Sequence, residues 1–391
     1  MATLAQSYND PINGTDSTIG KQLSTYYIQR QALTEARKDT VFMPLSDTVN
    51  LPKHFGKTLK RYHYIPLLDD ANVNSQGIDA NGATIANGNL YGSSKDVGTI
   101  AGKLPALAEH GGRVNRVGFK RKELEGSIDK FGFFEEYTQE SLDFDTDADL
   151  EKHVNREMIN GAHQMTEAAL QIDLLNSAGV VKYAGTALAK GDIDETSKIS
   201  FDDIMRINID LDNNRTPKQT TIITGTRNID TRVLPSARVA YCGSELIPTI
   251  KAMKDLHGNP AFISLEHYAA GTTTLNHEIG AIDQTRILIV PEMLRWEGQG
   301  KTTANMTIHT TGGKADVFPF LIIGDKSFQT IGFQTNGKTV KFVIRHKRPG
   351  IETTDRSDPY GTQGLMSIQW YYGFMALRPE RIGLILTAAN L

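Results

Sequence analysis

The sequence has few of the features that mark secreted, membrane-spanning or strongly basic proteins. Its 391 residues include one cysteine, Cys242, which cannot form an internal disulfide, so the composition is typical of a reducing compartment. No apolar run approaches the ~20 residues needed to span a bilayer, and the first residues lack the basic and apolar segments of a secretion signal. With 42 basic and 45 acidic residues the net charge is −3, which excludes a strongly basic nucleic-acid binder.

Apolar residues are also scarce, at 39%, whereas glycine is abundant, at 35 residues. At roughly 100–200 residues per domain, the length allows two or three domains or one scaffold with large insertions. The chain is long enough to bury a sizeable core. We therefore expect a globular protein with unusually long polar connections.

Glycines gather in residues 77–112, where large side chains are few. Alternating strand-like patterns at 57–65 and 113–121 enclose this segment. Loops longer than about 12–15 residues are uncommon inside a compact domain. The segment also has too little apolar surface to offset the entropy lost on ordering. We predict a long hairpin that leaves the body of the protein and becomes ordered against a neighbour.

The first 50 or so residues are polar, with one apolar-periodic patch. Within it, Leu23, Tyr26, Tyr27 and Leu33 are spaced to face one side of a short helix near 25–37. The segment is too polar to form a domain by itself. We predict an arm that lies on another part of the protein.

Residues 150–175 form the clearest helical pattern, with apolar residues at three- and four-residue spacing. Asp147 or Asp149 can cap its start, and Gly179 lies just past its end. At 1.5 Å per residue, this helix is a rod of roughly 39 Å.

Two further helices are predicted, at 201–211 and 244–256. Ser200 and Asp203 match a capping box before the first, and Ser244 is the expected cap of the second. Strands are expected at 131–137, 221–224, 287–290, 318–323, 341–344, 365–377 and 381–387.

Motifs for catalysis, cofactors and metals are incomplete in this sequence. Residues 98–103 resemble a phosphate-binding loop, but the spacing is one residue short and Leu104 replaces the magnesium-binding Ser or Thr. Residues 143–149 resemble a calcium loop, but Ala148 replaces the turn glycine and Val154 the bidentate glutamate. We predict no catalytic residue, no cofactor and no metal.

Charged clusters have two interpretations. Basic residues gather at 57–63, 113–122 and 341–348, and acidic residues at 143–151 and 192–195. They are either solvated strand faces or complementary patches that meet between copies of the chain and set their orientation.

Three stretches together carry a resemblance to a known family. They are Phe-Gly-Phe-Phe-Glu-Glu-Tyr-Thr at 131–138, Glu-Ile-Gly-Ala-Ile-Asp at 278–283, and Asp-Pro-Tyr-Gly-Thr-Gln-Gly at 358–364. The third precedes the Trp-Tyr-Tyr strand at 370–372. With these motifs in this order and spacing, residues 50–391 resemble the major capsid proteins of N-four-like tailed bacteriophages.

The resemblance implies the Hong Kong 97-type capsid fold, an α+β architecture. Its expected parts are an N-terminal arm at 1–52, an extended hairpin at 53–125, a peripheral domain at 126–221 with a spine helix at 150–175, an axial domain at 222–345, and a return to the peripheral domain at 346–391.

The resemblance also implies a structural protein, not an enzyme. Copies would form hexamers and pentamers of an icosahedral shell around double-stranded DNA, in the virion, after assembly in the cytoplasm of a bacterial host. Expected partners are further copies, portal, scaffolding and decoration proteins, and DNA bound without sequence specificity, but no membrane. Scaffolding is expected on a separate chain. The predicted subunit-interface residues are Arg61, Tyr62, Tyr91, Arg113, Arg116, Asp145 and Asp147.

Two other functions remain open at this point. One is an α+β enzyme whose glycine-rich segment is an active-site lid, which requires a pocket with perturbed ionisable groups near 77–112. The other is a DNA-binding module, which requires a continuous basic face and steep salt dependence. The balanced charge argues against the second.

Overall fold

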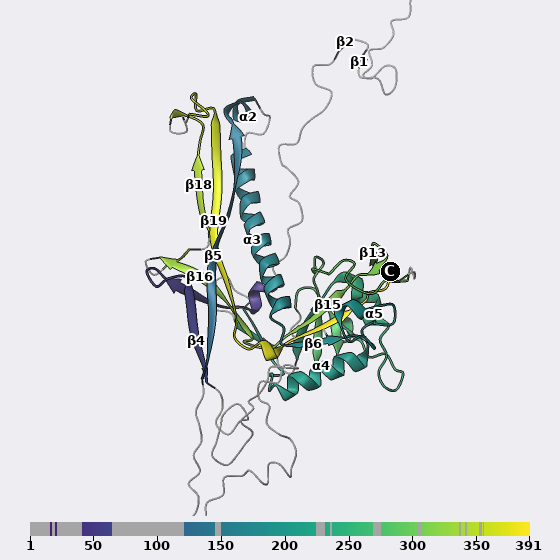
Figure 1. Cartoon of the computed structure of the whole chain (residues 1–391). Coiled ribbons are helices and arrows are strands. Elements are labelled where there is room, and N and C mark those ends of the chain that lie inside the picture. Colours follow the sequence, from purple (N-terminus) through teal and green to yellow (C-terminus); the bar gives the residue numbers. More distant parts are fainter. Residues whose placement is uncertain are drawn as a thin grey trace, which may run out of the picture.

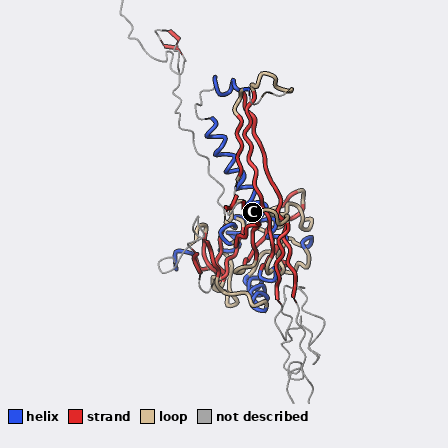
Figure 2. Tube along the Cα trace, turned by 90° about the vertical axis from the view of Figure 1, so that its left-hand side faces the viewer, coloured by secondary structure: helices blue, strands red, loops and turns tan. Residues whose placement is uncertain are grey.

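The structure is a computed structural model that describes residues 16–17, 20–21, 41–64, 121–144, 150–223, 231–234, 237–268, 275–303, 307–335, 338–340, 342–351, 354 and 356–391. These residues form two parts, a tall column of strands with one long helix and a compact lobe beside the lower half of the column (Figure 1). In the side view of Figure 2, the long strands rise together above the lobe.

The column contains a seven-stranded sheet in the order β17–β16–β19–β5–β4, with β18 on β19 and β3 on β16. Its strands are β3 (Asp47–Pro52), β4 (Thr58–Tyr64), β5 (Arg121–Thr138), β16 (Phe328–Thr335), β17 (Lys338–Val340), β18 (Val343–Lys347) and β19 (Gln363–Ala376). β5 and β19 pair over eleven residues and set the height of the column. β5 is much longer than the expected strand at 131–137, because the strand also includes the mostly polar residues 121–130, which precede the aromatic segment.

The stem of the predicted hairpin is present. β4 and β5 pair antiparallel, with Thr58 opposite Ser127 and Tyr64 opposite Arg121. The rest of the hairpin, including the glycine-rich segment 77–112 and most of the strand expected at 113–121, lies outside the described residues.

The predicted spine helix is confirmed as α3 (Leu150–Asn176), and the shorter α2 (Gln139–Phe144) lies at the upper end of the column (Figure 1). Met158 and Ala162 are buried against the sheet, and the Tyr372 hydroxyl on β19 donates to Asp173 at 2.7 Å. The expected caps Asp147 and Asp149 lie outside the described residues. Within the part of the chain that the structure describes, no helix is long and apolar enough to cross a membrane.

The lobe contains a second seven-stranded sheet, in the order β10–β11–β12–β9–β15–β20–β6. The strands are β6 (Val180–Tyr183), β9 (Arg238–Cys242), β10 (Ile263–Ser264), β11 (Glu278–Ile282), β12 (Thr285–Ile289), β15 (Phe318–Ile323) and β20 (Ile382–Thr387). Its central strands are buried on both faces, which explains why they are continuous apolar runs and not alternating patterns.

The two faces of the lobe sheet belong to different cores. Val239 and Tyr241 join the core that contains Leu170 and Leu174 of α3. Ala240 and Cys242, which point the other way, join the core under α4. Successive side chains of β9 therefore belong alternately to the core shared with α3 of the column and to the core under α4 of the lobe.

α4 (Phe201–Asn213) confirms the second predicted helix. Ser200 and Asp203 form the expected capping box, in which each side chain bonds the backbone N–H of the other residue. Its buried apolar residues Ile204, Ile207 and Leu211 cover the lobe sheet.

The prediction of a helix at 244–256 is wrong in both extent and cap. A 3₁₀ turn, η4 (Ser244–Leu246), leads into α5 (Ile247–Lys251), and the residue before the turn is Gly243, without a side-chain cap. The helix ends at Lys251, and turns follow it: Met253 donates its N–H to Ile250 O at 3.2 Å, and Asp255 accepts the backbone N–H groups of His257 and Asn259, both at 2.8 Å. This local side-chain bonding stabilises a turn in place of further helix.

The remaining elements are short. They are β1 (Asp16–Ser17), β2 (Gly20–Lys21), η1 (Met43–Leu45), η3 (Lys190–Asp192), β7 (Thr220–Ile223), β8 (Thr231–Leu234), α6 (Leu265–Tyr268), β13 (Thr310–Thr311), β14 (Lys314–Ala315) and η7 (Pro379–Arg381).

The spatial grouping of the elements crosses the expected domain boundaries. β6 and α4, expected in the peripheral segment 126–221, belong to the lobe, as does β20 from the expected return segment 346–391. β16 and β17, expected in the axial segment 222–345, belong to the column sheet. Strand partners far apart in sequence cause these differences. The assignment of residues to capsid domains remains a prediction.

Three chain segments connect column and lobe, and they lie against one another. Gly179, after α3, donates its N–H to Pro379 O at 2.9 Å. Gly324, between β15 and β16, donates to Arg381 O at 3.0 Å. A β-carbon at Gly179 would lie 2.6 Å from Pro379 O, so this position requires glycine. At the junction between column and lobe, the backbones of these segments therefore lie directly against one another.

Candidate assembly surfaces

Large apolar side chains are exposed at the upper end of the column, which we call the tip. Phe144 at the end of α2 is 83% exposed. Ile351 and Tyr360, in the loop between β18 and β19, are 91% and 87% exposed. Isolated exposed apolar residues are common, but several large ones at one end of a molecule indicate a contact surface.

The loop that carries Tyr360 is fixed by hydrogen bonds. Asp358 accepts the backbone N–H of Gln363 at 2.9 Å and the hydroxyl of Thr362 at 3.1 Å, and these bonds hold the pKa of its carboxyl below the ordinary value. The Gln139 N–H of α2 donates to Thr362 O at 2.8 Å. The tip is therefore a defined surface that combines α2 and the loop.

A charged cluster below the tip connects α3 to two strands. Glu151 in the first turn of α3 pairs with Arg348 at 2.7 Å, and Tyr137 on β5 bonds His346 on β18. Burial raises the pKa of Tyr137. Because Arg348 is largely exposed, its ion pair with Glu151 contributes little to stability. The pair mainly holds the start of α3 beside the end of β18.

Two predicted interface residues lie in the hairpin stem. Arg61 donates to Gln329 of its own chain at 3.2 Å. Tyr62 is about half exposed, and the Arg121 guanidinium lies 4.1 Å from its ring centre. Lys60 pairs with Glu123 at 2.6 Å, so glutamates of β5 partly neutralise the basic strand.

The other predicted interface residues, Tyr91, Arg113, Arg116, Asp145 and Asp147, lie outside the described residues. Sequence reasoning missed the tip residues Phe144, Ile351 and Tyr360. The available signal was weak, since each is a large apolar residue in a polar segment that no helical or strand periodicity explains.

Shifted ionisable groups have structural causes in the described residues. Burial raises the pKa of Glu167, although the backbone N–H groups of Phe42 and Val41 that it accepts lower it. Burial also raises the pKa of Asp173, partly offset by the hydrogen bond from Tyr372. Among the residues with described positions, no group of three or more His, Cys, Asp or Glu is arranged to hold a metal.

Comparison with known proteins identifies the family. A family model described as a phage capsid protein matches residues 121–385. The major capsid protein of Pseudomonas phage KPP21 is 62% identical over 386 residues, which cover 98% of this chain and 97% of that protein. The chain belongs to the phage major capsid proteins. The resemblance to this family that the sequence motifs suggested is therefore confirmed.

Solved capsid structures share the fold of this major capsid protein. The capsid of Ralstonia phage GP4 is 12% identical with a TM-score of 0.58, and the similarity covers 95% of this chain and 97% of that chain. The capsid of Cyanophage Pam1 is 11% identical with a TM-score of 0.53 over 100% of both chains. The expected Hong Kong 97-type α+β fold is confirmed.

Membership of the phage major capsid proteins also decides the class of function. The chain is a structural protein of the virion capsid that self-assembles into a shell. It is not an enzyme, and the comparisons give the alternative of an enzyme with a glycine-rich lid no support.

Proposed function

We propose that this capsid protein assembles as hexamers and pentamers that close into an icosahedral shell around double-stranded DNA. The observation that carries the proposal is the column, whose upper half rises above the lobe and which bears both the hairpin stem and the apolar tip. Contacts in such rings are heterologous, because one face meets a different face of the next copy.

The exposed tip supports contacts between copies of the chain. Phe144, Ile351 and Tyr360 remain in water in a single copy as far as its structure is described. Apolar surface gains roughly 25 cal/mol per Å² on burial, so a contact at the tip stabilises an assembly more than exposed ion pairs do.

Charge supports the role of a container. A net charge of −3 limits attraction to packaged DNA, because each neutralised phosphate adds salt-dependent affinity. We include DNA without sequence specificity, portal, scaffolding and decoration proteins as partners, and the cytoplasm of a bacterial host as the place of assembly.

Within the shell, the lobe is the axial domain of the proposal, and the column combines the peripheral domain with the base of the extended hairpin. The basic stem of one copy then meets acidic residues of the next. The interface residues of the proposal are Arg61, Tyr62, Tyr91, Arg113, Arg116, Asp145 and Asp147.

Substitution of the tip tests the proposal. A triple variant, Phe144→Asp, Ile351→Asp and Tyr360→Asp, is expected to yield folded protein without closed shells in negative-stain electron microscopy. The matched control, Phe144→Leu, Ile351→Leu and Tyr360→Phe, keeps the apolar character and is expected to form shells. Normal shells from the aspartate variant would refute the role of the tip.

Deletion of residues 77–112 tests the hairpin separately. The stem pairs of β4 and β5 remain in this variant, so we expect a soluble, folded monomer. Circular dichroism checks the fold and electron microscopy the assembly. If the shortened chain formed normal shells, the hairpin would not be an assembly element.

A further inference from the structure

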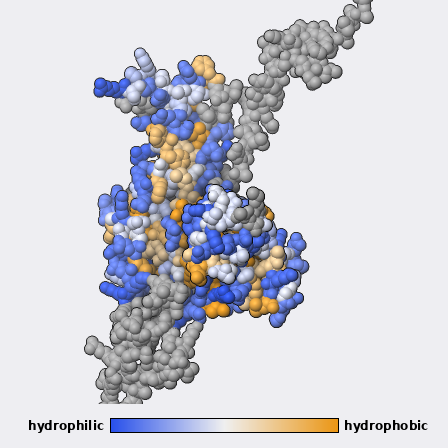
Figure 3. All heavy atoms as spheres, turned by 45° about the vertical axis from the view of Figure 1, so that its right-hand side comes forward, coloured by the Kyte–Doolittle hydropathy of each residue, from blue (hydrophilic) through white to orange (hydrophobic). Residues whose placement is uncertain are grey.

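An apolar stripe on α3 has no cover in the described part of the chain. Met165 is 51% exposed and Ile172 is 49% exposed, and Ala168 between them is also exposed. Their spacing of three and four residues places them on one side of the helix. We call these three residues the spine-helix stripe. Figure 3 shows hydrophobic surface on the column above the lobe.

The composition of α3 around the stripe is unusual for a helix surface. Between Met158 and Ile172 the only ionisable residues are His163 and Glu167. The exposed side of a helix in water normally carries several charges. Glu167 is moreover engaged elsewhere, which leaves this side of the helix suited to an apolar partner.

Glu167 anchors the N-terminal arm to the body of the protein at Val41 and Phe42. Its Oε1 accepts the backbone N–H of Val41 at 2.7 Å and of Phe42 at 2.6 Å. The Phe42 ring is buried, with its centre 4.9 Å from that of Tyr241 in the lobe. Figure 1 shows η1, directly after these residues, against the lower half of α3. The arm therefore leaves the body at the height of the stripe.

The chain before this anchor matches the stripe in length and in pattern. Val41 lies eight positions after Leu33, and at about 3.3 Å per position this distance along the chain reaches roughly 26 Å. Met165 and Ile172, at the two ends of the stripe, are seven positions apart, which is about 10 Å along the helix. Leu23, Tyr26, Tyr27 and Leu33 provide the one-sided apolar pattern of an amphipathic helix.

We propose that the spine-helix stripe is the docking site for residues 23–33 of the same chain's N-terminal arm. Anchoring at Glu167 keeps the arm close to the stripe, and a short tether gives a high effective concentration. Docking in this way covers Met165 and Ile172 and directs the arm along the column. The contact is intramolecular and does not depend on ring or shell formation, so it is tested on the monomer.

Cysteine pairs test which segment occupies the stripe. Leu23→Cys or Leu33→Cys is combined with Met165→Cys or Ile172→Cys in the full chain, and monomers are isolated at low concentration before mild oxidation. The native Cys242 is buried, and burial raises the pKa of its thiol, so it does not compete. The matched control places the second cysteine at Ile209, an exposed apolar residue of α4.

Non-reducing electrophoresis and peptide mass spectrometry then identify the linked residues. We expect a disulfide within the monomer band for at least one stripe pair and none for the Ile209 control. Linkage found only in a dimer band would overturn the proposal and assign the stripe to the arm of a second copy. An absence of linkage at all stripe pairs would overturn it as well.

Proteolysis supplies an independent readout. Ile172→Glu is expected to release the arm, so that trypsin cleaves after Arg30 and Arg37 roughly tenfold faster, since cleavage follows the population of the open form. Ile209→Glu makes the same chemical change on α4 and is expected to leave the rate unchanged. Equal rates in both variants would overturn the proposal, and circular dichroism confirms that both are folded.

Discussion

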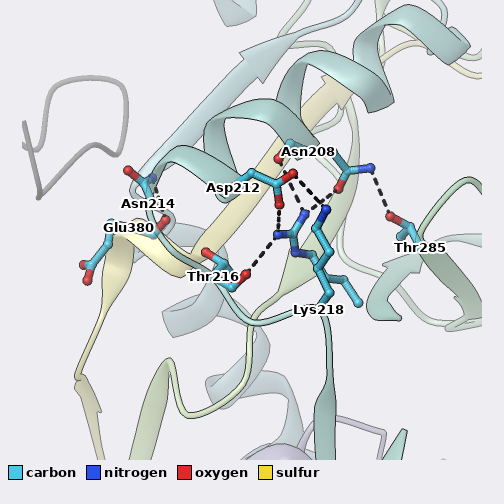
Figure 4. Close-up of polar contacts among 8 residues, drawn as sticks. Asn208, Asp212, Asn214, Thr216, Lys218, Thr285 and Glu380 are labelled. Atoms are coloured by element: carbon cyan, nitrogen blue, oxygen red, sulfur yellow. Dashed lines mark hydrogen bonds and ion pairs between the residues drawn. The ribbon is translucent and has the colours of Figure 1, made fainter. Parts of the chain in front are cut away.

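Arg238 on β9 connects the lobe sheet to the end of α4, and its replacement by methionine is predicted to destabilise the lobe. The guanidinium is fully buried and bonds the Asp212 carboxylate. It also donates to Thr216 O at 3.0 Å and to Asn208 Oδ1 at 3.2 Å (Figure 4). One side chain thus satisfies acceptors from the last turns of α4 and from the segment that follows.

The expected cost of Arg238→Met is about 2–6 kcal/mol, and most of it comes from buried acceptors that are left without a donor. Two buried neutral acceptors, Thr216 O and Asn208 Oδ1, lose their donor, at roughly 1–3 kcal/mol each. Asp212 adds less, because its side chain is 42% exposed and water replaces part of the lost interaction. Methionine keeps most of the apolar stem, so a cavity contributes little.

Lys218→Met is the matched control for this prediction. Lys218 pairs with the same Asp212 at 3.1 Å, but it is exposed, so we expect a loss of about 0–1 kcal/mol. Urea unfolding of the unassembled protein, followed by far-ultraviolet circular dichroism, measures both variants. If Arg238→Met lost no more stability than Lys218→Met, the assignment of Arg238 as the main connection would be refuted.

The same pair predicts a dependence on pH. Burial raises the pKa of Asp212, but the hydrogen bonds from Arg238 and Lys218 outweigh it and lower the pKa below the ordinary 3.8. The stabilisation is therefore present above pH 3.8 and is lost as the pH falls further, through the folded-state pKa. The stability difference between the native chain and Arg238→Met should shrink in that range.

Three further predictions concern single positions. Ser200→Ala removes half of the capping box of α4 and should cost about 0.5–2 kcal/mol in urea unfolding, whereas Ser200→Asp should not. Gly373→Ala places a β-carbon 2.3 Å from Ser127 O and should cost about 1–3 kcal/mol, seen as a lower melting temperature; an unchanged value would contradict the packing of β19 on β5. Burial raises the pKa of Glu380, so stability should fall as the pH rises above the ordinary 4.5, and Glu380→Gln should flatten this slope.

Local patterns predicted the elements whose stability depends on neighbouring residues in sequence. The three- and four-residue spacing predicted α3, and the Ser200 and Asp203 pair predicted the start of α4. The hairpin stem followed from two alternating segments around a glycine-rich one. The order of the three motifs at 131–138, 278–283 and 358–364 predicted the family, and the family implied the fold.

Sequence reasoning failed where the deciding contact was tertiary or an unrecognised turn. The helix at 244–256 was predicted too long, because its apolar pattern does not reveal the turns that follow Lys251, one of which the Asp255 carboxylate stabilises. The tip was missed, because the exposure of Phe144 and Tyr360 depends on where the column ends. The predicted interface residues remain predictions.

The sequence by itself determined the long helix, the stem of the hairpin and the balanced charge, because each follows from composition or from residues a few positions apart. Only the tertiary structure decided that β6, α4 and β20 share the lobe with β9 while β16 joins the column. Strand pairing between residues hundreds of positions apart is selected by the burial of whole faces, and no local pattern specifies which strands will share a sheet.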